Sequence, residues 1–549
     1  MRLLATLLFT FLSLFFSFSV SANADVLNKF GGNIPISAYT PHSIKDTLSP
    51  HLSSSASIVL PGDAEYEELI TKYSDYNRPT YSAVIAVASI EDVVATVKYA
   101  RENNIPFLVQ SGGHSLTTST QITQNAIQIN MRRLSYIRFD GERGPDYAVV
   151  GGGTLTGEFA NATHAKHREV TVGSCPCTGV MGIGLGAGIG RLQGMYGYFM
   201  DNIVELTLVL YDGSIVTVSE TSNTDLWWAV RGAGHNFGVA VEAVVKTHPQ
   251  LNAGKHFVAD MEFPVSQTAE LFQLMNEIST PDLPPELAFF ITAHYKGKSG
   301  KPIINIDFVW HGPREAALPY LQPFLDLAPI FRKEEYVTWD SLPWVTYLEL
   351  NNILCSQPGG QRNFYAANAA TYDISAMVSL FEDWEKTSKE YVGRATLLLM
   401  FQTFGQGKVQ AVEADASVFP WRDGAKHFLI VQATYKDLSL RMTLDRWLKA
   451  AQNLIIESSG YGRLQQYVNY GHGFADSAES LYGYDGHRMA RLLELKDKYD
   501  PEGWFDAYQP VRRSPRGGLR EASILPKRPR ASRKLEVKEG VKNSKHDEL

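Results

Sequence analysis

Two glycine turns in the sequence carry side chains that could hold or react with a bound cofactor. Residues 111–115 read Ser-Gly-Gly-His-Ser, with His114 near the end of the turn. Residues 173–179 read Gly-Ser-Cys-Pro-Cys-Thr-Gly and present the thiol of Cys175 in a second turn. Backbone amides in such turns can bind a phosphate, and glycine lets a ligand approach the main chain closely. We therefore expect a large cofactor to lie against these segments.

The next segment, residues 179–197, is richer still in glycine and contains Gly-x-Gly-x-x-Ala from Gly182 to Ala187. This spacing matches the dinucleotide fingerprint, which requires a strand before it and a helix that begins inside it. The residues before it, 173–177, do not read as a buried strand, and the glycines after it disfavour a helix. The sequence therefore argues against a nicotinamide site here, although the closely approachable amides still suit a cofactor.

The hydrophobic pattern predicts the elements that position the first turn. A strand at 82–88 and a helix at 90–103 precede a strand at 107–110, which leads directly into the Ser-Gly-Gly-His sequence. Short strands and helices continue in this way to about residue 249. This part of the chain is predicted to be an α+β or α/β unit.

A second unit follows, in which glycine is rarer. From about residue 254 to 460, apolar strands such as 302–310 and 427–434 alternate with helical stretches such as 376–391. We interpret this part as a second domain.

Composition restricts the classes of function. The chain has 549 residues, 44% hydrophobic and 20% charged, which is typical of a soluble globular protein with two or three folded units. A formal net charge of -7 gives no general basic bias, so nucleic acid is not an expected partner. Three cysteines cannot form a disulfide framework. We also expect no metal site, and we expect the protein to be a monomer.

Both ends of the chain carry targeting signals. An apolar run at 3–20 leads into Ala22-Asn23-Ala24, the pattern of a cleaved secretory signal, with a membrane anchor as the alternative. The last four residues are His-Asp-Glu-Leu, the sequence read by the retrieval receptor of the endoplasmic reticulum. We expect a protein of the lumen of the endoplasmic reticulum with no stable membrane span. Residues 511–549 are predicted to be a basic, flexible tail that presents this signal to the HDEL receptor.

Taken in order, these segments resemble the PCMH-type FAD-binding domain of the vanillyl-alcohol-oxidase superfamily, and most of all the berberine-bridge-enzyme group of FAD-linked oxidases. Two further segments carry the resemblance: 225–239, which ends in Gly238-Val239, and the closing part of the chain with Tyr-Val-Asn-Tyr at 467–470. The resemblance implies an α+β fold. A two-subdomain FAD-binding domain would occupy 76–250, and an α/β substrate domain with an antiparallel sheet would occupy 251–460.

The resemblance covers about residues 76–509 and leaves the two ends of the chain to the signals described above. The signal peptide at 1–24 and an N-terminal extension at 25–75 would precede the FAD-binding domain. Residues 461–510 would return to that domain after the substrate domain, ahead of the tail at 511–549.

The resemblance also assigns the cofactor contacts. His114 would bond the 8α-methyl carbon of the flavin and Cys175 its C6 carbon, so that FAD is held by two covalent bonds. Imidazole nitrogen and thiolate are the side-chain nucleophiles best suited to attack this electron-poor ring. The other implied contacts are Ser111, Gly112, Gly113, Ser115, Thr178, Gly179, Gly182, Gly186, Gly238, Val239 and Asn469.

Some assignments stay open. The family motif places its cysteine directly before proline, which selects Cys175 and leaves Cys177 either structural or a disulfide partner of Cys355. A noncovalent FAD with buried free thiols is the alternative. The family's usual arginine before Ser-Gly-Gly-His is here Gln110, which removes one phosphate or flavin contact.

The implied chemistry is hydride transfer to FAD, for which a base must take a substrate proton. The strand at 427–434 places Gln432 on one face with Ile430 and Thr434 and offers no carboxylate, so Gln432 is the candidate catalytic residue of this strand. Tyr467 and Tyr470 are therefore the candidate bases, with a phenolate stabilised by a cation such as Lys436; their alternative role is packing.

We expect an FAD-dependent oxidase of a small-molecule alcohol or amine, in secondary metabolism, with reoxidation by O2. Thr178 stands at the position through which oxygen reaches the flavin in the family and is close to valine in volume; Ile183, at a second such position, is large. A carbohydrate oxidase of the same fold is one alternative, with Trp310, Trp339 and Trp344 as sugar platforms or core residues. A noncatalytic flavin-binding protein of the lumen is the other.

Overall fold

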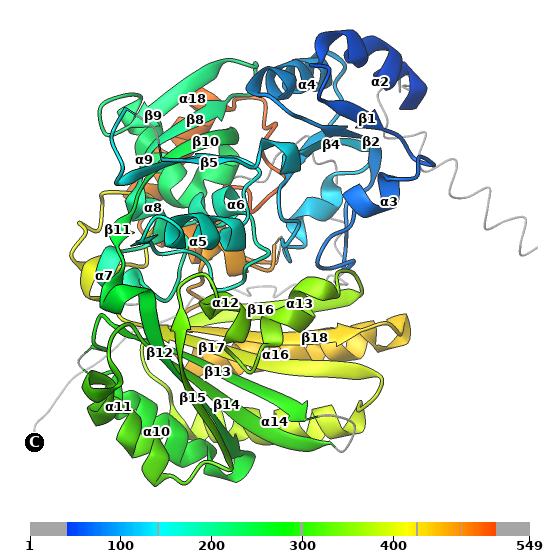
Figure 1. Cartoon of the computed structure of the whole chain (residues 1–549). Helices are drawn as coiled ribbons and strands as arrows, with labels where there is room; N and C mark the ends of the chain where they lie inside the picture. Colours follow the sequence, from blue (N-terminus) through cyan, green and yellow to red (C-terminus); the bar gives the residue numbers. More distant parts are fainter. Residues whose placement is uncertain are drawn as a thin grey trace, which may run out of the picture.

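The computed structural model describes residues 41–139, 142–280, 282–296, 300–423, 426–473 and 475–511. The predicted signal peptide and HDEL sequence lie outside these residues. The described chain forms two halves: an upper half with two main sheets and a lower half with one large sheet (Figure 1). Among the described helices, none has the length and apolar character needed to cross a membrane.

A four-stranded sheet in the upper half carries the first glycine turn. Its order is β1 (Ser57–Val59), β2 (Tyr81–Ala86), β4 (Ala126–Asn130), β3 (Phe107–Gln110), with β4 parallel to both β2 and β3. The helix α4 (Ile90–Glu102) connects β2 to β3 and begins at a capping box between Ser89 and Asp92. The predicted strand at 107–110 is therefore found, and the Ser-Gly-Gly-His sequence follows its carboxyl end.

A five-stranded antiparallel sheet forms the rest of the upper half. Its order is β5 (Ile137–Arg138), β6 (Tyr147–Gly151), β10 (Val239–Lys246), β8 (Ile203–Val209), β9 (Ile215–Ser219). Five helices accompany it: α5 (Thr156–His164), α6 (Val180–Gly184), α7 (Gln193–Tyr196), α8 (Phe199–Asn202) and α9 (Thr224–Ala233). A two-stranded ribbon of β7 (Arg168–Glu169) and β11 (His248–Pro249) stands beside it.

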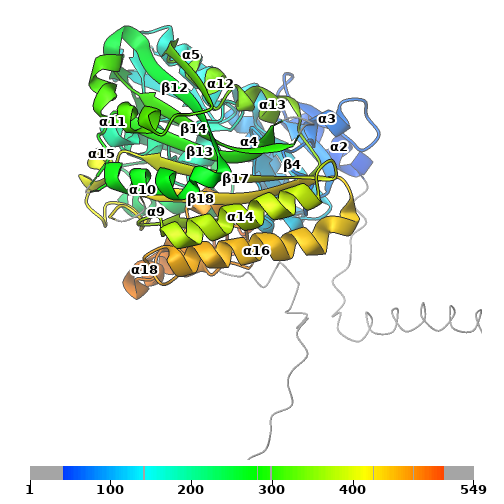
Figure 2. The same ribbon diagram turned by 90° about the horizontal axis from the view of Figure 1, so that it is seen from below.

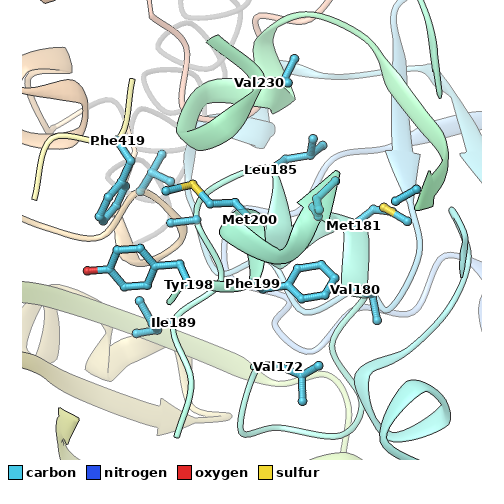
Figure 3. Packing of buried hydrophobic residues seen from close by; sticks show 14 of the residues in the cluster. Val172, Val180, Met181, Leu185, Ile189, Tyr198, Phe199, Met200, Val230 and Phe419 are labelled. Atoms are coloured by element: carbon cyan, nitrogen blue, oxygen red, sulfur yellow. The ribbon is translucent and has the colours of Figure 1, made fainter. Parts of the chain in front are cut away.

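The glycine-rich segment 179–197 is buried in the core of the upper half (Figure 3). Val180, Met181, Leu185 and Ile189 from this segment pack with Tyr198, Phe199, Met200, Val230 and Phe419. A Cβ atom added at Gly184 would lie 2.8 Å from the Phe199 ring, and one at Gly190 would lie 2.1 Å from the Val172 carbonyl oxygen. Close packing therefore requires glycine at these positions.

The lower half is a seven-stranded antiparallel sheet. Its order is β15 (Phe331–Thr338), β12 (Lys255–Pro264), β14 (Lys301–Trp310), β13 (Leu287–Lys296), β17 (Ala395–Phe404), β18 (His427–Tyr435), β16 (Gln361–Ala369). The helices α10 (Thr268–Ile278), α11 (Arg314–Asp326), α14 (Ile374–Glu390) and α16 (Arg441–Ser458) cover one face, and α14 lies beside α16 (Figure 2). On β18, Leu429 and Val431 point into the core under these helices, while Ile430 and Gln432 point toward the upper half.

Short elements join the halves. The helices α12 (Leu342–Val345) and α13 (Leu350–Ser356) lie at the boundary between them (Figure 1). After α16 the chain returns to the upper half through α17 (Ala478–Tyr482) and α18 (Gly486–Tyr499). Trp504 and Phe505 pack on Phe107 of β3. The predicted fold class, a two-part α+β protein whose second part has an antiparallel sheet, is confirmed.

The start of the described chain and one further short helix complete the fold. Residues 41–75 belong to the predicted N-terminal extension and contain α2 (Pro41–Leu48), β1 and α3 (Tyr66–Leu69). Through β1 they supply an edge strand of the four-stranded sheet. The helix α15 (Gly407–Gln410) packs against α7.

Candidate active site

A cavity of about 390 Å³ lies at the boundary between the two halves. Its walls come from the two glycine turns, from the inner face of the seven-stranded sheet and from the returning C-terminal segment. Most of the predicted cofactor residues line it: Ser111, Gly112, Gly113, His114, Ser115, Cys175, Thr178, Gly179, Gly182, Gly238, Val239 and Asn469. The three candidate catalytic residues, Gln432, Tyr467 and Tyr470, line the same cavity.

Gly186 is the exception. It is absent from the cavity wall, and a Cβ atom added there would lie 2.5 Å from Oδ1 of Asn469 and 2.7 Å from Cγ1 of Val468. The structure therefore corrects its predicted role as a cofactor contact. This glycine lets the 467–470 segment pack against the glycine-rich segment.

The two glycine turns touch each other, which brings His114 and Cys175 together. A Cβ atom at Gly112 would lie 2.4 Å from the carbonyl oxygen of Cys177 and 2.8 Å from the amide nitrogen of Gly179. As a result, a ring nitrogen of His114 and the sulfur atoms of Cys175 and Cys177 all lie within 4.8 Å of one another. Such a group could hold a metal ion, but Cys177 forms a disulfide with Cys355 and has no thiolate to offer.

His114 is held neutral by its surroundings. Its imidazole stacks on the ring of Tyr73, with the two ring centroids 4.7 Å apart. The guanidinium of Arg362 lies over the same Tyr73 ring, 4.3 Å from its centroid. Burial, and then the positive charge of Arg362, lower the pKa of His114 to about 4. A neutral imidazole has a free nitrogen lone pair, as a nucleophile needs.

Cys175 is the free cysteine of the Cys-Pro-Cys sequence. Its carbonyl oxygen accepts hydrogen bonds from the hydroxyls of Thr156 at 2.5 Å and Thr178 at 2.9 Å, which fix the backbone of the turn. Burial raises the pKa of the Cys175 thiol to about 11, so the thiol is protonated at neutral pH in the described structure.

The disulfide between Cys177 and Cys355 decides between the roles that the sequence left open for Cys177. The two Cα atoms are 5.9 Å apart, which is within the ordinary range for a disulfide. Cys355 lies on α13, so the bond joins the second glycine turn to an element of the lower half.

The hydroxyl of Tyr467 is engaged by the protein. It accepts hydrogen bonds from the Gly188 amide at 3.1 Å and from Nδ2 of Asn469 at 2.6 Å. Nδ2 of Asn469 also donates to the carbonyl oxygen of Ile183 at 3.1 Å. Both side chains therefore tie the 467–470 segment to the glycine-rich segment.

Tyr470 has a single side-chain partner, Gln402 of β17, whose Nε2 lies 2.8 Å from the Tyr470 oxygen. Burial raises the pKa of Tyr470 to about 12 and raises that of Tyr467 further. Lys436, the cation expected to lower one of these values, is exposed. The expectation of a lowered tyrosine pKa is therefore wrong for the described structure, because no charge near these rings offsets their burial.

Sequence reasoning missed Gln402. Its signal was available in principle, because β17 alternates and places Met400 and Gln402 on the cavity face, as β18 places Ile430 and Gln432. It missed Arg362 as well, whose guanidinium donates to the carbonyl oxygens of Tyr73, Gln357 and Gly359.

The tryptophans weighed as sugar platforms do not line the cavity. Trp310 stacks on Tyr320 in the lower core, and Trp339 donates a hydrogen bond to Thr163 at 3.1 Å. Trp344 is likewise outside the cavity wall. The lower half instead contributes the apolar side chains Phe290, Leu354, Phe364, Met400 and Ile430 to the cavity wall.

The residues present fit FAD. The hydroxyls of Ser111 and Ser115 are buried in the cavity wall without a hydrogen-bond partner among the described residues, beside the amides of a glycine turn. Buried hydroxyls of this kind imply a polar ligand group next to them. Gln110 does not serve this purpose, since its Nε2 donates to the carbonyl oxygens of Leu69 at 3.1 Å and Thr71 at 3.3 Å.

Comparison with known proteins agrees with this geometry. Residues 81–219 match the family described as the FAD binding domain. An FAD-linked oxidoreductase of Alternaria solani is 39% identical over 492 residues, which cover 88% of this chain and 98% of that protein.

Solved structures share the fold. A 6-hydroxy-D-nicotine oxidase of Arthrobacter nicotinovorans is 22% identical, with a TM-score of 0.71 over 84% of this chain and 98% of that chain. A glucooligosaccharide oxidase of Acremonium strictum, whose structure is described as revealing a novel flavinylation, is 20% identical, with a TM-score of 0.71 over 85% and 97%.

Proposed function

Because the chain belongs to the FAD-linked oxidoreductases, we propose that it oxidises a small-molecule alcohol or amine with a covalently bound FAD that O2 reoxidises. The observation that carries this proposal is the meeting of His114 and Cys175 in one cavity, with Tyr470 in the same wall.

The two proposed covalent bonds fit the spacing of the side chains. The 8α-methyl carbon and C6 belong to the same terminal ring of the flavin, so their protein partners must stand about one ring's width apart. A His114 nitrogen and the Cys175 sulfur within 4.8 Å of each other meet this condition. The neutral imidazole of His114 supports its role as the nucleophile for the methyl carbon.

When bound, FAD supplies a hydride acceptor; the chain's own residues supply the proton transfer and the orientation. The Tyr470 oxygen would take the proton of the substrate's hydroxyl or amine, since the geometry leaves it free to bind a ligand group. Nε2 of Gln402, 2.8 Å away, can donate to this oxygen and stabilise the phenolate. Tyr467 and Asn469 hold the backbone of the glycine-rich segment through their hydrogen bonds to Gly188 and Ile183.

A small-molecule alcohol or amine suits the cavity better than a carbohydrate does. A sugar presents many hydroxyls that need hydrogen-bond partners, whereas the substrate side is walled by Phe290, Phe364, Met400 and Ile430. The polar groups in this wall include the hydroxyls of Tyr347 and Tyr470 and the amides of Gln402 and Gln432. An apolar metabolite with one reacting polar group is the expected substrate.

Oxygen access rests on Thr178. Its hydroxyl donates to the Cys175 carbonyl, and its small side chain lines the cavity beside the second turn. The larger Ile183 lines the same cavity. We propose an oxidase rather than a dehydrogenase on the size of Thr178. We further propose the lumen of the endoplasmic reticulum as its location, on the sequence signals at the two ends.

Acid precipitation tests the covalent cofactor. The denatured wild-type protein should stay yellow, because covalent bonds survive unfolding. His114→Ala should leave FAD attached through Cys175, and the double variant with Cys175→Ala should release it. A colourless wild-type precipitate with free FAD in the supernatant would end the covalent proposal.

Anaerobic flavin reduction tests the reaction. Reduction by alcohols or amines supports the proposal, and admission of air should then restore the oxidised spectrum with release of hydrogen peroxide. Reduction by sugars alone would make the protein a carbohydrate oxidase. A flavoprotein that no member of the three classes reduces would favour the noncatalytic alternative.

A further inference from the structure

The helix α13 reaches the second glycine turn with two side chains. Asn351 and Cys355 are four residues apart, so they lie on the same face of this helix. Nδ2 of Asn351 donates to the carbonyl oxygen of Ser174 at 3.0 Å, and Cys355 is bonded to Cys177. These two contacts flank Cys175, one on each side of it in the sequence.

Asn351 is itself fixed. It is 3% exposed, and its Nδ2 also donates to the carbonyl oxygen of Pro343 in α12 at 2.7 Å. A buried hydrogen bond of this kind is costly to leave unmade, so α13 holds the turn firmly from the lower half.

The upper half holds the same turn from its other side. The Gly157 amide, at the start of α5, donates to the Pro176 carbonyl oxygen at 2.9 Å. The Thr156 hydroxyl donates to the Cys175 carbonyl oxygen. The backbone of residues 174–177 is thus fixed from two elements that belong to different halves of the molecule.

We propose that α13 acts as a clamp that assigns the flavin thioether to Cys175: Asn351 and the disulfide position the turn, and the disulfide withdraws Cys177 from reaction. This inference rests on the proposed covalent FAD. Asn351 and Cys355 are positioning residues in it, and neither reacts with the flavin.

The need for such a device follows from the chemistry. In thioether formation the S–H and C6–H bonds break, a bond between sulfur and C6 forms, and two hydrogens with their electrons reduce dioxygen to hydrogen peroxide. The sulfur of Cys177 stands within 4.8 Å of that of Cys175 and of the His114 nitrogen. As a free thiol it would be a second nucleophile at almost the same place.

Positioning also matters for Cys175 alone. A thiol held at its target reacts as though at high local concentration, and a small displacement loses much of that advantage. Release of the turn should therefore lower the occupancy of the thioether while the bond to His114, which belongs to the first turn, still forms.

Peptide mass spectrometry of the purified, full-length holoprotein tests the clamp, since it locates each flavin bond. Wild type should carry FAD on His114 and Cys175. Cys355→Ser should keep the bond to His114 and lose at least half of the thioether from Cys175, with part of it moved to Cys177. Asn351→Ala should lower the thioether occupancy with the disulfide intact.

Exposed neighbours on the same helix serve as matched controls. Asn352→Ala and Ser356→Ala should leave both bonds at wild-type occupancy. The bond between FAD and His114 reports that the cavity has folded. If Cys355→Ser lacks this bond, the Asn351→Ala variant alone tests the clamp. A full thioether on Cys175 in Asn351→Ala, and in Cys355→Ser if it folds, would overturn the clamp. Absence of any thioether from wild type would instead overturn the proposed bicovalent FAD.

Discussion

Tyr467 and Tyr470 stand three residues apart on one short segment, yet their hydroxyls differ in what they can still bind. The oxygen of Tyr467 already accepts hydrogen bonds from Gly188 and Asn469. The oxygen of Tyr470 meets one buried amide, that of Gln402, in the cavity wall. Tyr470 is therefore the better proton acceptor of the two.

Substitution of each tyrosine by phenylalanine tests this distinction. Tyr470→Phe should lower the rate of anaerobic flavin reduction by about 10²–10⁴-fold, since it removes the base and keeps the ring. Tyr467→Phe should change this rate far less and should mainly lower thermal stability. Stopped-flow absorbance measures the first effect; equal losses in the two variants would contradict the assignment.

The raised pKa of Tyr470 sets the expected pH profile. The base must be deprotonated, so the reduction rate should rise with pH. Because burial moves the pKa of Tyr470 to about 12, the rise should continue without a plateau up to about pH 10, the value of a free tyrosine. A plateau at neutral pH would show that the bound cofactor or substrate lowers this pKa strongly.

At this scale, local sequence was informative where a residue stands in a distinctive motif. His114 and Cys175 could be singled out because glycine turns surround them. Gln402 and Asn351 could not be singled out in this way: alternation places Gln402 on one face of β17, but a lone amide in a strand or helix does not indicate a functional role. Their contacts join residues far apart in the chain, to Tyr470 and to Ser174.

The glycine-rich segment 179–197 acts as an element that joins the two halves. Its Arg191 is 4% exposed and reaches Asp307 of β14 at 3.2 Å and the Thr346 hydroxyl at 2.9 Å. Asp260 of the neighbouring strand β12 is also buried, and burial together with the charge of Asp307 raises its pKa. The Arg191 guanidinium thus pairs with Asp307, one of two buried carboxylates on neighbouring strands.

Arg191→Met should lower the free energy of unfolding by about 3–5 kcal/mol, because it leaves a buried carboxylate without its partner. The exposed pair of Arg143 and Glu205 gives a matched control, and Arg143→Met should cost less than about 1 kcal/mol. Denaturant titration measures both. Burial raises the pKa of Asp307, so the loss in Arg191→Met should shrink as pH falls and Asp307 becomes neutral.

Periodicity predicted the separate elements well and their joining poorly. The strands predicted at 107–110, 302–310 and 427–434 correspond to β3, β14 and β18 within one residue. An alternating pattern states which face of β18 carries Gln432, but it does not state what covers that face. The packing role of Gly186 was hidden for the same reason, since spacing cannot distinguish a glycine that meets a ligand from one that meets Asn469.

For the molecule as a whole, the cavity belongs to neither half alone. The cofactor residues come from the upper half, while Tyr347, Gln402 and Gln432 come from the lower. The sequence predicted two parts of this kind, and the family resemblance predicted that the closing segment would return. Only the structure shows that α13 and Arg362 of the lower half also support the two cofactor turns.

The proposed location is tested on the whole protein in cells. Deletion of residues 546–549 should send the protein into the medium, because retrieval to the endoplasmic reticulum depends on this sequence. Immunoblots of cells and medium measure the distribution, with a scrambled tetrapeptide as a second variant. Unchanged intracellular retention of both would show that His-Asp-Glu-Leu does not hold it there.

The return of the chain has a consequence for the order of synthesis. The Gln509 amide donates to the Ser119 hydroxyl, and the Val511 amide donates to Oδ1 of Asn236. The last described residues therefore bind to the half of the protein that is synthesised first. A ribosome releases residue 511 only after the entire seven-stranded sheet has emerged. Cys355 follows Cys177 by 178 residues, so the second glycine turn gains its disulfide only after part of the lower half has been made. Trp504, Phe505 and Tyr508 of the cavity wall come later still, so the cavity is complete only when nearly all of the described chain has been synthesised.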